Sequence, residues 1–117
     1  MKQFHHVALL SNNERPGEVF NDLLKIWVVC PDDDPHCVEW IRIASDSPLI
    51  DTPLAKMPHI AWQVDDLDKE LENKDVVFGP FEAGEGLRAA FFMSNDALIE
   101  YMEFSSKQRA KLCCFWE

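Results

Sequence analysis

Two histidines and two glutamates occupy duplicated positions in this chain. His6 and His59 each begin an apolar segment that ends in a polar turn, and an apolar segment with a single central acid follows later in each half, at Glu39 and Glu100. Two neutral imidazoles and two carboxylates form a donor set that suits Zn, Ni, Co, Mn or Fe better than Ca or Mg. The repeat therefore predicts one divalent transition metal, bound between two related halves and able to act as a Lewis acid.

The elements that must position these side chains can be predicted from hydrophobic periodicity and turn residues. In the first half we expect a strand over residues 3–10, a helix from Pro16 to about Leu24, and strands over 26–30 and 37–44, with a loop at 31–35. In the second half we expect a strand from His59, a helix near 65–71 and strands over 76–81, 87–93 and 98–104. The second half thus has the order β-α-β-β-β.

The first half is the shorter of the two. His6 and Glu39 are 33 residues apart, whereas His59 and Glu100 are 41 apart, which predicts the loss of a hairpin near the Asp-rich loop. We predict a single α+β domain over residues 1–117 with two tandem βαβββ modules, the first one shortened. Module 1 spans about 1–47, a proline-rich surface linker without regular structure spans about 48–57, and module 2 spans about 58–117.

Composition limits the classes of partner. The chain has 117 residues, 47% hydrophobic residues, a net charge of -10 and a pI near 4.7, so it can fold but should not bind nucleic acid or an anionic membrane. Neither a signal-peptide pattern nor an apolar run of about 20 residues is visible, and we expect a cytoplasmic protein. Its four cysteines are then expected to be free thiols.

Strand alternation predicts which side chains face the metal. His59 should share a face with Gln63, and Glu100 with Met102, while the opposite face is covered by helices. Adjacent His5 should then point away from the site. Weaker candidates for a substrate pocket are Gln63, Arg88, Phe92 and Met102. The Arg88 side chain has two open placements, one holding an anionic substrate and the other in solvent.

These segments together resemble a known superfamily. The pairing of HHVALL with PHIAWQVDDLD, and of VEWIRI with LIEYMEF, resembles the vicinal oxygen chelate superfamily across residues 5–104. That superfamily includes glyoxalase, methylmalonyl-CoA epimerase, extradiol dioxygenases and bleomycin-resistance proteins. The resemblance implies a U-shaped, partly open mixed sheet that cups a metal, with helices on its convex face. It assigns metal ligation to His6, His59 and Glu100. The fourth ligand would be Glu39, although the short first module leaves the register of Glu39 open.

Two functions follow from the resemblance. The first is a metal-dependent glyoxalase-like lyase, isomerase or epimerase that chelates neighbouring oxygens of a small substrate and stabilises an enediolate, with Glu100 or Glu39 as the catalytic proton carrier. The alternative is a non-catalytic protein that sequesters a small molecule, as bleomycin-resistance proteins do. The resemblance and the exposed sheet edges of so small a cup both favour a homodimer. Substrate and metal identity stay open, as does whether one chain or two build the site.

Overall fold

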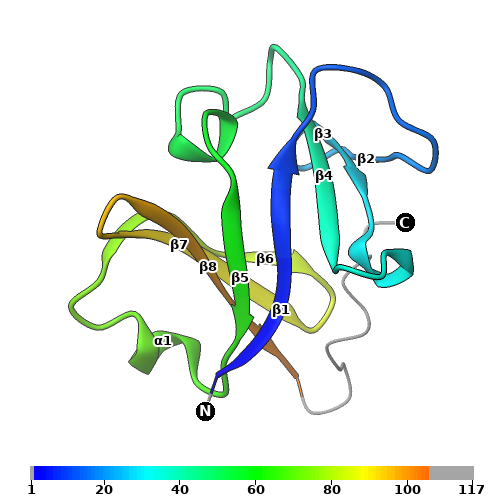
Figure 1. The fold of residues 1–117 in the computed structure, drawn as a ribbon. Helices are drawn as coiled ribbons and strands as arrows, with labels where there is room; N and C mark the ends of the chain where they lie inside the picture. Colours follow the sequence, from blue (N-terminus) through cyan, green and yellow to red (C-terminus); the bar gives the residue numbers. More distant parts are fainter. Residues whose placement is uncertain (1, 106–117) are drawn as a thin grey trace.

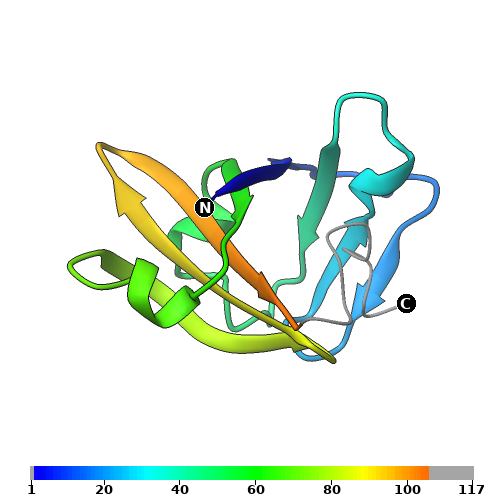
Figure 2. The same cartoon turned by 90° about the horizontal axis from the view of Figure 1, so that it is seen from below.

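The computed structural model describes residues 2–105 as one curled, eight-stranded mixed sheet that forms a half-barrel (Figures 1 and 2). The strand order is β2-β3-β4-β1-β5-β8-β7-β6, and the cup-like α+β fold expected from the sequence is confirmed. In chain order the elements are β1 (Gln3–Leu10), β2 (Val19–Asn21), β3 (Ile26–Val29), the 3-10 turn η1 (Pro31–Asp33), β4 (Val38–Ile43), the 3-10 turn η2 (Pro53–Ala55), β5 (His59–Gln63), α1 (Leu67–Glu70), β6 (Asp75–Gly84), β7 (Leu87–Ser94) and β8 (Ala97–Phe104).

The sheet has approximate twofold symmetry in both strand order and register. Strands β1 and β5 run antiparallel to each other at the centre, and each has a parallel partner from its own half, β4 and β8 respectively. Ala8 of β1 lies opposite Glu39 of β4, just as Ala61 of β5 lies opposite Glu100 of β8. Equivalent positions of the two halves therefore meet at the centre of the concave face.

The second half has the predicted order β-α-β-β-β. Its helix α1 begins after Asp66, whose side chain accepts a hydrogen bond from the Lys69 amide. The fully buried Leu67 of α1 packs with Phe92 and Tyr101 on the convex face of the sheet. Among residues 2–105, no helix is long and apolar enough to cross a membrane.

The helix predicted in the first half is wrong. Pro16 and Gly17 lie in a turn, with Gly17 at a φ of +85°, and the chain then enters the short strand β2 instead of a helix. A Pro-Gly pair favours a turn, and the residues Val19 and Phe20 that follow favour a strand. All four strands of the first half are present, so the shortening removes the helix and not a hairpin.

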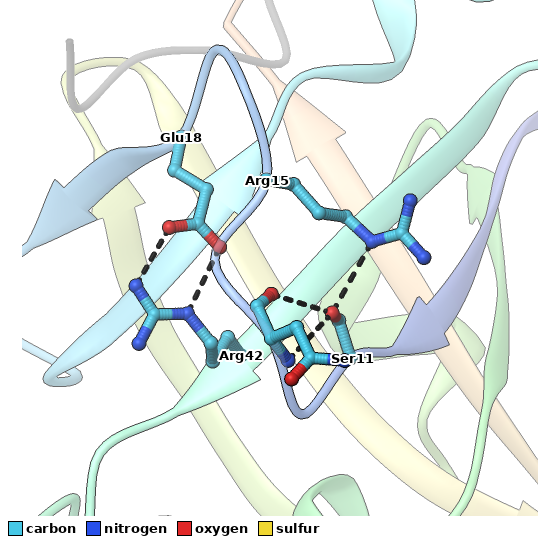
Figure 3. Close-up of polar contacts among 5 residues, drawn as sticks. Ser11, Arg15, Glu18 and Arg42 are labelled. Carbon is cyan, nitrogen blue, oxygen red and sulfur yellow. Dashed lines mark hydrogen bonds and ion pairs between the residues drawn. The ribbon is translucent and has the colours of Figure 1, made fainter.

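Arginine side chains occupy the convex face where the first half has no helix. Arg42 of β4 donates two hydrogen bonds to Glu18, at 2.7 and 3.0 Å, which fixes the loop between β1 and β2 to the sheet (Figure 3). The guanidinium of Arg42 also lies 3.9 Å from the ring centroid of Trp27, and that of Arg15 lies 3.5 Å from that of Trp40. In the first half, guanidinium groups over indole rings thus cover the part of the convex face that is equivalent to the part covered by α1 in the second half.

The segment between the halves has more structure than its prolines predicted. It contains the 3-10 turn η2, where Thr52 Oγ1 accepts a hydrogen bond from the Leu54 amide. Ser47, Leu49 and Leu54 are all at least 95% buried. The Ser47 hydroxyl donates to the Leu24 carbonyl at 2.6 Å and accepts from the Leu49 amide at 3.1 Å. The segment is therefore anchored to the first half and contributes to the core.

The Asp-rich loop between β3 and β4 is organised by Asp34. Its Oδ2 accepts hydrogen bonds from the backbone amides of His36 and Val38, both at 2.9 Å. The expectation of reduced cysteines is confirmed for Cys37, which is a free thiol, and is wrong for Cys30, which is disulfide-bonded. Residues 113 and 114, the other two cysteines, lie outside the described residues.

Candidate metal centre

Three predicted ligands converge at the centre of the concave face. His6 of β1, His59 of β5 and Glu100 of β8 each offer one ligand atom, and these atoms lie within 4.8 Å of one another. Glu100 Oε1 is 3.6 Å from His6 Nε2 and 3.2 Å from His59 Nε2. All three residues are buried, with exposed fractions of 2%, 4% and 7%. The described residues thus contain a His-His-Glu group with the spacing needed to hold a metal ion.

The two histidines meet because of the register between β1 and β5. His6 lies opposite Ala61 and His59 lies opposite Ala8, so the imidazoles are diagonal neighbours on one face of an antiparallel pair. Their ring centroids are 5.9 Å apart. The small alanines leave space above the sheet that the imidazole rings occupy.

Glu39 faces the same cup. It is 5% exposed, and its Oε1 lies 3.3 Å from His6 Nε2. Glu39 lies opposite Ala8 in the pairing of β1 with β4, and this register directs its side chain into the cup. A register shifted by one residue would have turned Glu39 outward. Glu39 borders the convergent group on the His6 side but is not one of its three members.

The two imidazoles lack hydrogen-bond partners on the side that faces the carboxylates. His6 Nε2 and His59 Nε2 are both buried, and neither makes a hydrogen bond of good geometry. Buried polar atoms without partners are rare and costly, and they often mark the place of an absent ion or ligand. Two imidazole nitrogens beside carboxylate oxygens are a donor set that fits a divalent transition metal.

Electrostatics at the site favour bound positive charge. Burial by itself lowers the pKa of His6, but the nearby carboxylates of Glu39 and Glu100 outweigh it and raise this pKa to about 9. Burial likewise raises the pKa of Glu39, but the positive charge of the nearby His6 outweighs burial, and the net pKa is below the ordinary value. In the metal-free protein, a proton on His6 therefore partly balances the buried carboxylates.

A small apolar cavity adjoins the candidate ligands. It has a volume of about 40 Å³, and no lysine or arginine lies among the described residues that line it. Both halves and the segment between them contribute apolar side chains to its wall, among them Ile26, Ile41, Leu49, Leu54, Phe81, Phe91 and Met102. Among the residues from 2 to 105 that line it, the only charged or titratable ones are the two histidines and the two glutamates of the centre.

Among the weaker pocket candidates, Met102 lines the cavity and the others do not. Phe92 packs under α1 on the convex face, and its neighbour Phe91 lines the cavity with its ring centroid 5.0 Å from that of His59. Strand alternation from Leu87 would have selected Phe91, because the two residues share a face of β7. Gln63 is half-buried, with an Oε1 that has no hydrogen-bond partner, but it does not line the cavity.

Arg88 takes the second of its two predicted placements. Its guanidinium binds Asp68 of α1 at 3.0 Å and Glu103 of β8 at 3.3 Å. Ion pairing with Asp68, rather than substrate binding, is thus the role its position supports. This interaction joins α1 to the convex face of the sheet.

His5 lies beside His6 instead of pointing away from the site. The pairing of β1 with β5 shifts register between Phe4 and His6, and this bulge turns the His5 ring toward its neighbour. The Nδ1 atoms of His5 and His6 are 2.7 Å apart. A prediction based on regular alternation could not have placed His5 there, because the bulge interrupts the alternation.

Solved structures of other proteins share this fold. No family model matches the chain, and neither does any curated protein sequence. Among solved structures, a hypothetical protein from Bacillus halodurans C-125 matches with a TM-score of 0.60 and 12% identity, over 92% of this chain and 98% of the other. Methylmalonyl-CoA epimerase from Mycobacterium tuberculosis matches with a TM-score of 0.55 and 16% identity, over 89% of each chain. The chain therefore has the fold of that epimerase.

Proposed function

We propose that this protein is a small metal-dependent enzyme of the vicinal oxygen chelate superfamily, of the lyase, isomerase or epimerase type. The observation that carries the proposal is the pair of buried, unpartnered Nε2 atoms of His6 and His59 beside Glu100. The fold shared with an epimerase supports it. Fold alone does not assign a reaction, so the argument depends on the site.

His6, His59 and Glu100 would hold one divalent metal, with Zn, Ni, Co, Mn and Fe all compatible with these donors. Once bound, the metal would supply Lewis-acid stabilisation of the negative charge that develops on two neighbouring substrate oxygens. The duplicated strands β1 and β5 hold the two imidazoles in place. The two imidazoles would thus come from the two central strands, and Glu100 from β8, the neighbour of β5.

Glu39 is the residue best placed to move a proton. It faces the cup but lies outside the group of three, and its lowered pKa keeps it ionised near neutral pH. An ionised carboxylate can accept a proton from a carbon next to a carbonyl group and return it to the same or a neighbouring atom. The adjoining wall is largely apolar, and a substrate that displaced water from it would strengthen electrostatic interactions inside the cup.

The lining of the cavity limits the charge and polarity of a substrate that could bind there. Because its wall lacks cationic side chains among the described residues, we expect a small molecule with two adjacent oxygens on an uncharged, apolar body. A phosphate or a second carboxylate buried there would have no partner. Any larger charged part of a substrate would have to lie outside this cavity.

A binding protein of the bleomycin-resistance type is the second candidate. The observation that favours it is the apolar cavity, which could retain a small molecule without any chemistry.

A homodimer also remains our proposal. The edge strands β2 and β6 carry Phe20 and Val76, which are 41% and 37% exposed, and a second copy could cover them. Sedimentation equilibrium would measure the oligomeric state.

Exchange of substrate hydrogen with solvent separates the two functions. Protein loaded with Co²⁺ is incubated in D₂O with a panel of small α-hydroxy ketones, and NMR follows loss of the C–H signal beside the carbonyl. The enzyme should catalyse exchange with at least one compound. Glu39→Gln should abolish that exchange while retaining Co²⁺, and Glu103→Gln, on the opposite face of β8, should retain both. Binding of a compound without exchange would favour the binding protein, and failure to take up Co²⁺ would contradict the enzyme.

A further inference from the structure

The contact between His5 and His6 bears on how the candidate centre is prepared for a metal. The two Nδ1 atoms are 2.7 Å apart, a distance at which one ring must donate a hydrogen and the other must accept it. His6 directs its other nitrogen, Nε2, at the carboxylates of Glu39 and Glu100. The direction of the hydrogen bond therefore decides which nitrogen of His6 is available to a metal.

The surroundings of His6 select one direction. A metal bound at Nε2 requires a lone pair there, so the hydrogen of a neutral His6 must be on Nδ1. A protonated His6 also carries a hydrogen on Nδ1. In both forms His6 donates from Nδ1, and His5 Nδ1 must be the acceptor.

We propose that His5 is a positioning residue that holds His6 in its Nδ1–H form, with the Nε2 lone pair directed into the cup. The inference rests on the metal site of the proposed function. Histidine ligands in metalloproteins commonly donate their other N–H to a carboxylate, a carbonyl or water. Here a neighbouring imidazole on the same strand performs that role.

Two structural features fix the His5 ring. The bulge between Phe4 and His6 brings His5 to the side of its neighbour, and the His5 ring stacks on Phe104 of β8 with centroids 5.7 Å apart and planes 27° apart. A half-buried ring held in this way loses little additional freedom when it accepts a hydrogen bond. The bulge thus allows the side chains of two consecutive strand residues, His5 and His6, to contact each other.

The second half lacks this device. Pro58 precedes His59 at the position that corresponds to His5, and proline has no side chain that could accept a hydrogen bond. The twofold symmetry of the ligands is therefore broken at the residues that precede them. His5 should affect His6 specifically and leave His59 unchanged.

The test uses protein labelled with ¹⁵N at histidine. In the wild type, a ¹⁵N–¹⁵N coupling across the hydrogen bond should join the His5 and His6 rings, and long-range ¹H–¹⁵N spectra of zinc-loaded protein should show His6 protonated at Nδ1. His5→Phe keeps a ring that can stack on Phe104 but removes the acceptor. It should weaken Zn²⁺ binding by about 10- to 100-fold, as loss of an outer partner of a histidine ligand does elsewhere. His5→Asn, which offers a carbonyl acceptor, should recover part of the affinity.

Controls separate this inference from the proposed function. His36→Phe, in the loop between β3 and β4, should bind Zn²⁺ like the wild type, and circular dichroism should show that His5→Phe is folded. Wild-type protein that binds no Zn²⁺ would overturn the proposed function and this inference together. Zinc-binding wild type in which the coupling is absent, or whose His5→Phe variant binds Zn²⁺ equally well, would overturn this inference alone.

Discussion

Glu39 and Glu100 occupy equivalent registers in the two halves of the sheet, each on the parallel partner of a central strand and each opposite an alanine. Their surroundings nevertheless differ. Glu100 Oε1 lies within 3.6 Å of the Nε2 atoms of both histidines, whereas Glu39 Oε1 lies 3.3 Å from His6 Nε2. The backbone is symmetrical but the surroundings of the two carboxylates are not, which is consistent with the roles that we propose, metal binding for Glu100 and proton transfer for Glu39.

Glu100→Gln should weaken metal binding strongly. A neutral amide would replace an anionic ligand next to two imidazoles, and the loss of affinity for Zn²⁺ should exceed the roughly 10- to 100-fold effect of losing an outer hydrogen-bond partner. Isothermal titration calorimetry of protein purified without an affinity tag would measure it. Glu103→Gln is the matched control, since Glu103 lies on β8 but contacts Arg88. Equal affinities in the two variants would contradict the assignment of Glu100 as a ligand.

The metal-free protein should lose stability as pH rises. The pKa of His6 is about 9 in the folded state and about 6.5 in the unfolded state, so the folded state holds more protons between these values. The stabilisation is fully present below pH 6.5 and is lost as pH passes 9, and its upper limit is about 3 kcal/mol. Urea unfolding from pH 6 to 9.5 with a chelator present would measure it. His6→Gln should remove this pH dependence and His36→Gln should retain it.

The convergence of the candidate metal ligands and the positions of most strands could be predicted from the repeat. Apolar segments with one histidine or one acid recur in both halves, and strand alternation places His59 and Glu100 on one face. Aromatic residue type alone does not distinguish Phe91 from its neighbour Phe92, whereas strand alternation from Leu87 places Phe91 on the cavity face. Residue spacing therefore identifies the candidate metal ligands better than it identifies the residues of the pocket wall.

Three features depend on tertiary structure that local patterns do not encode. Pro16 suits the start of a helix, but Gly17 at positive φ and pairing of β2 with β3 override that preference. The bulge at His5 appears only in the pairing of β1 with β5. The anchoring of the central segment by Ser47 depends on contacts with residue 24, which the sequence of that segment alone cannot show.

Ser47→Ala should destabilise the protein by about 1–3 kcal/mol. The Ser47 hydroxyl both donates to Leu24 O and accepts from Leu49 N, and its removal would leave two buried backbone groups without partners. Thermal and urea unfolding would measure the change. Ser94→Ala, at an exposed residue of β7, should change the free energy of unfolding by less than about 0.5 kcal/mol. Similar effects at both serines would show that this anchor does not hold the segment.

Leu54→Ala should test whether the central segment closes the cavity. Leu54 is 5% exposed and lines the cavity from η2, so its truncation should destabilise the protein by about 2–5 kcal/mol and enlarge the space beside the metal centre. Because Leu54 is not among the convergent ligands, Zn²⁺ affinity should change little while the protein stays folded. Larger α-hydroxy ketones should then be accepted in the exchange assay in preference to the smallest ones.

Leu23→Ala is the control for Leu54→Ala, since Leu23 is 65% exposed and its truncation should alter neither stability nor selectivity appreciably. Unchanged selectivity in a folded, destabilised Leu54→Ala would mean that the substrate binds elsewhere in the cup.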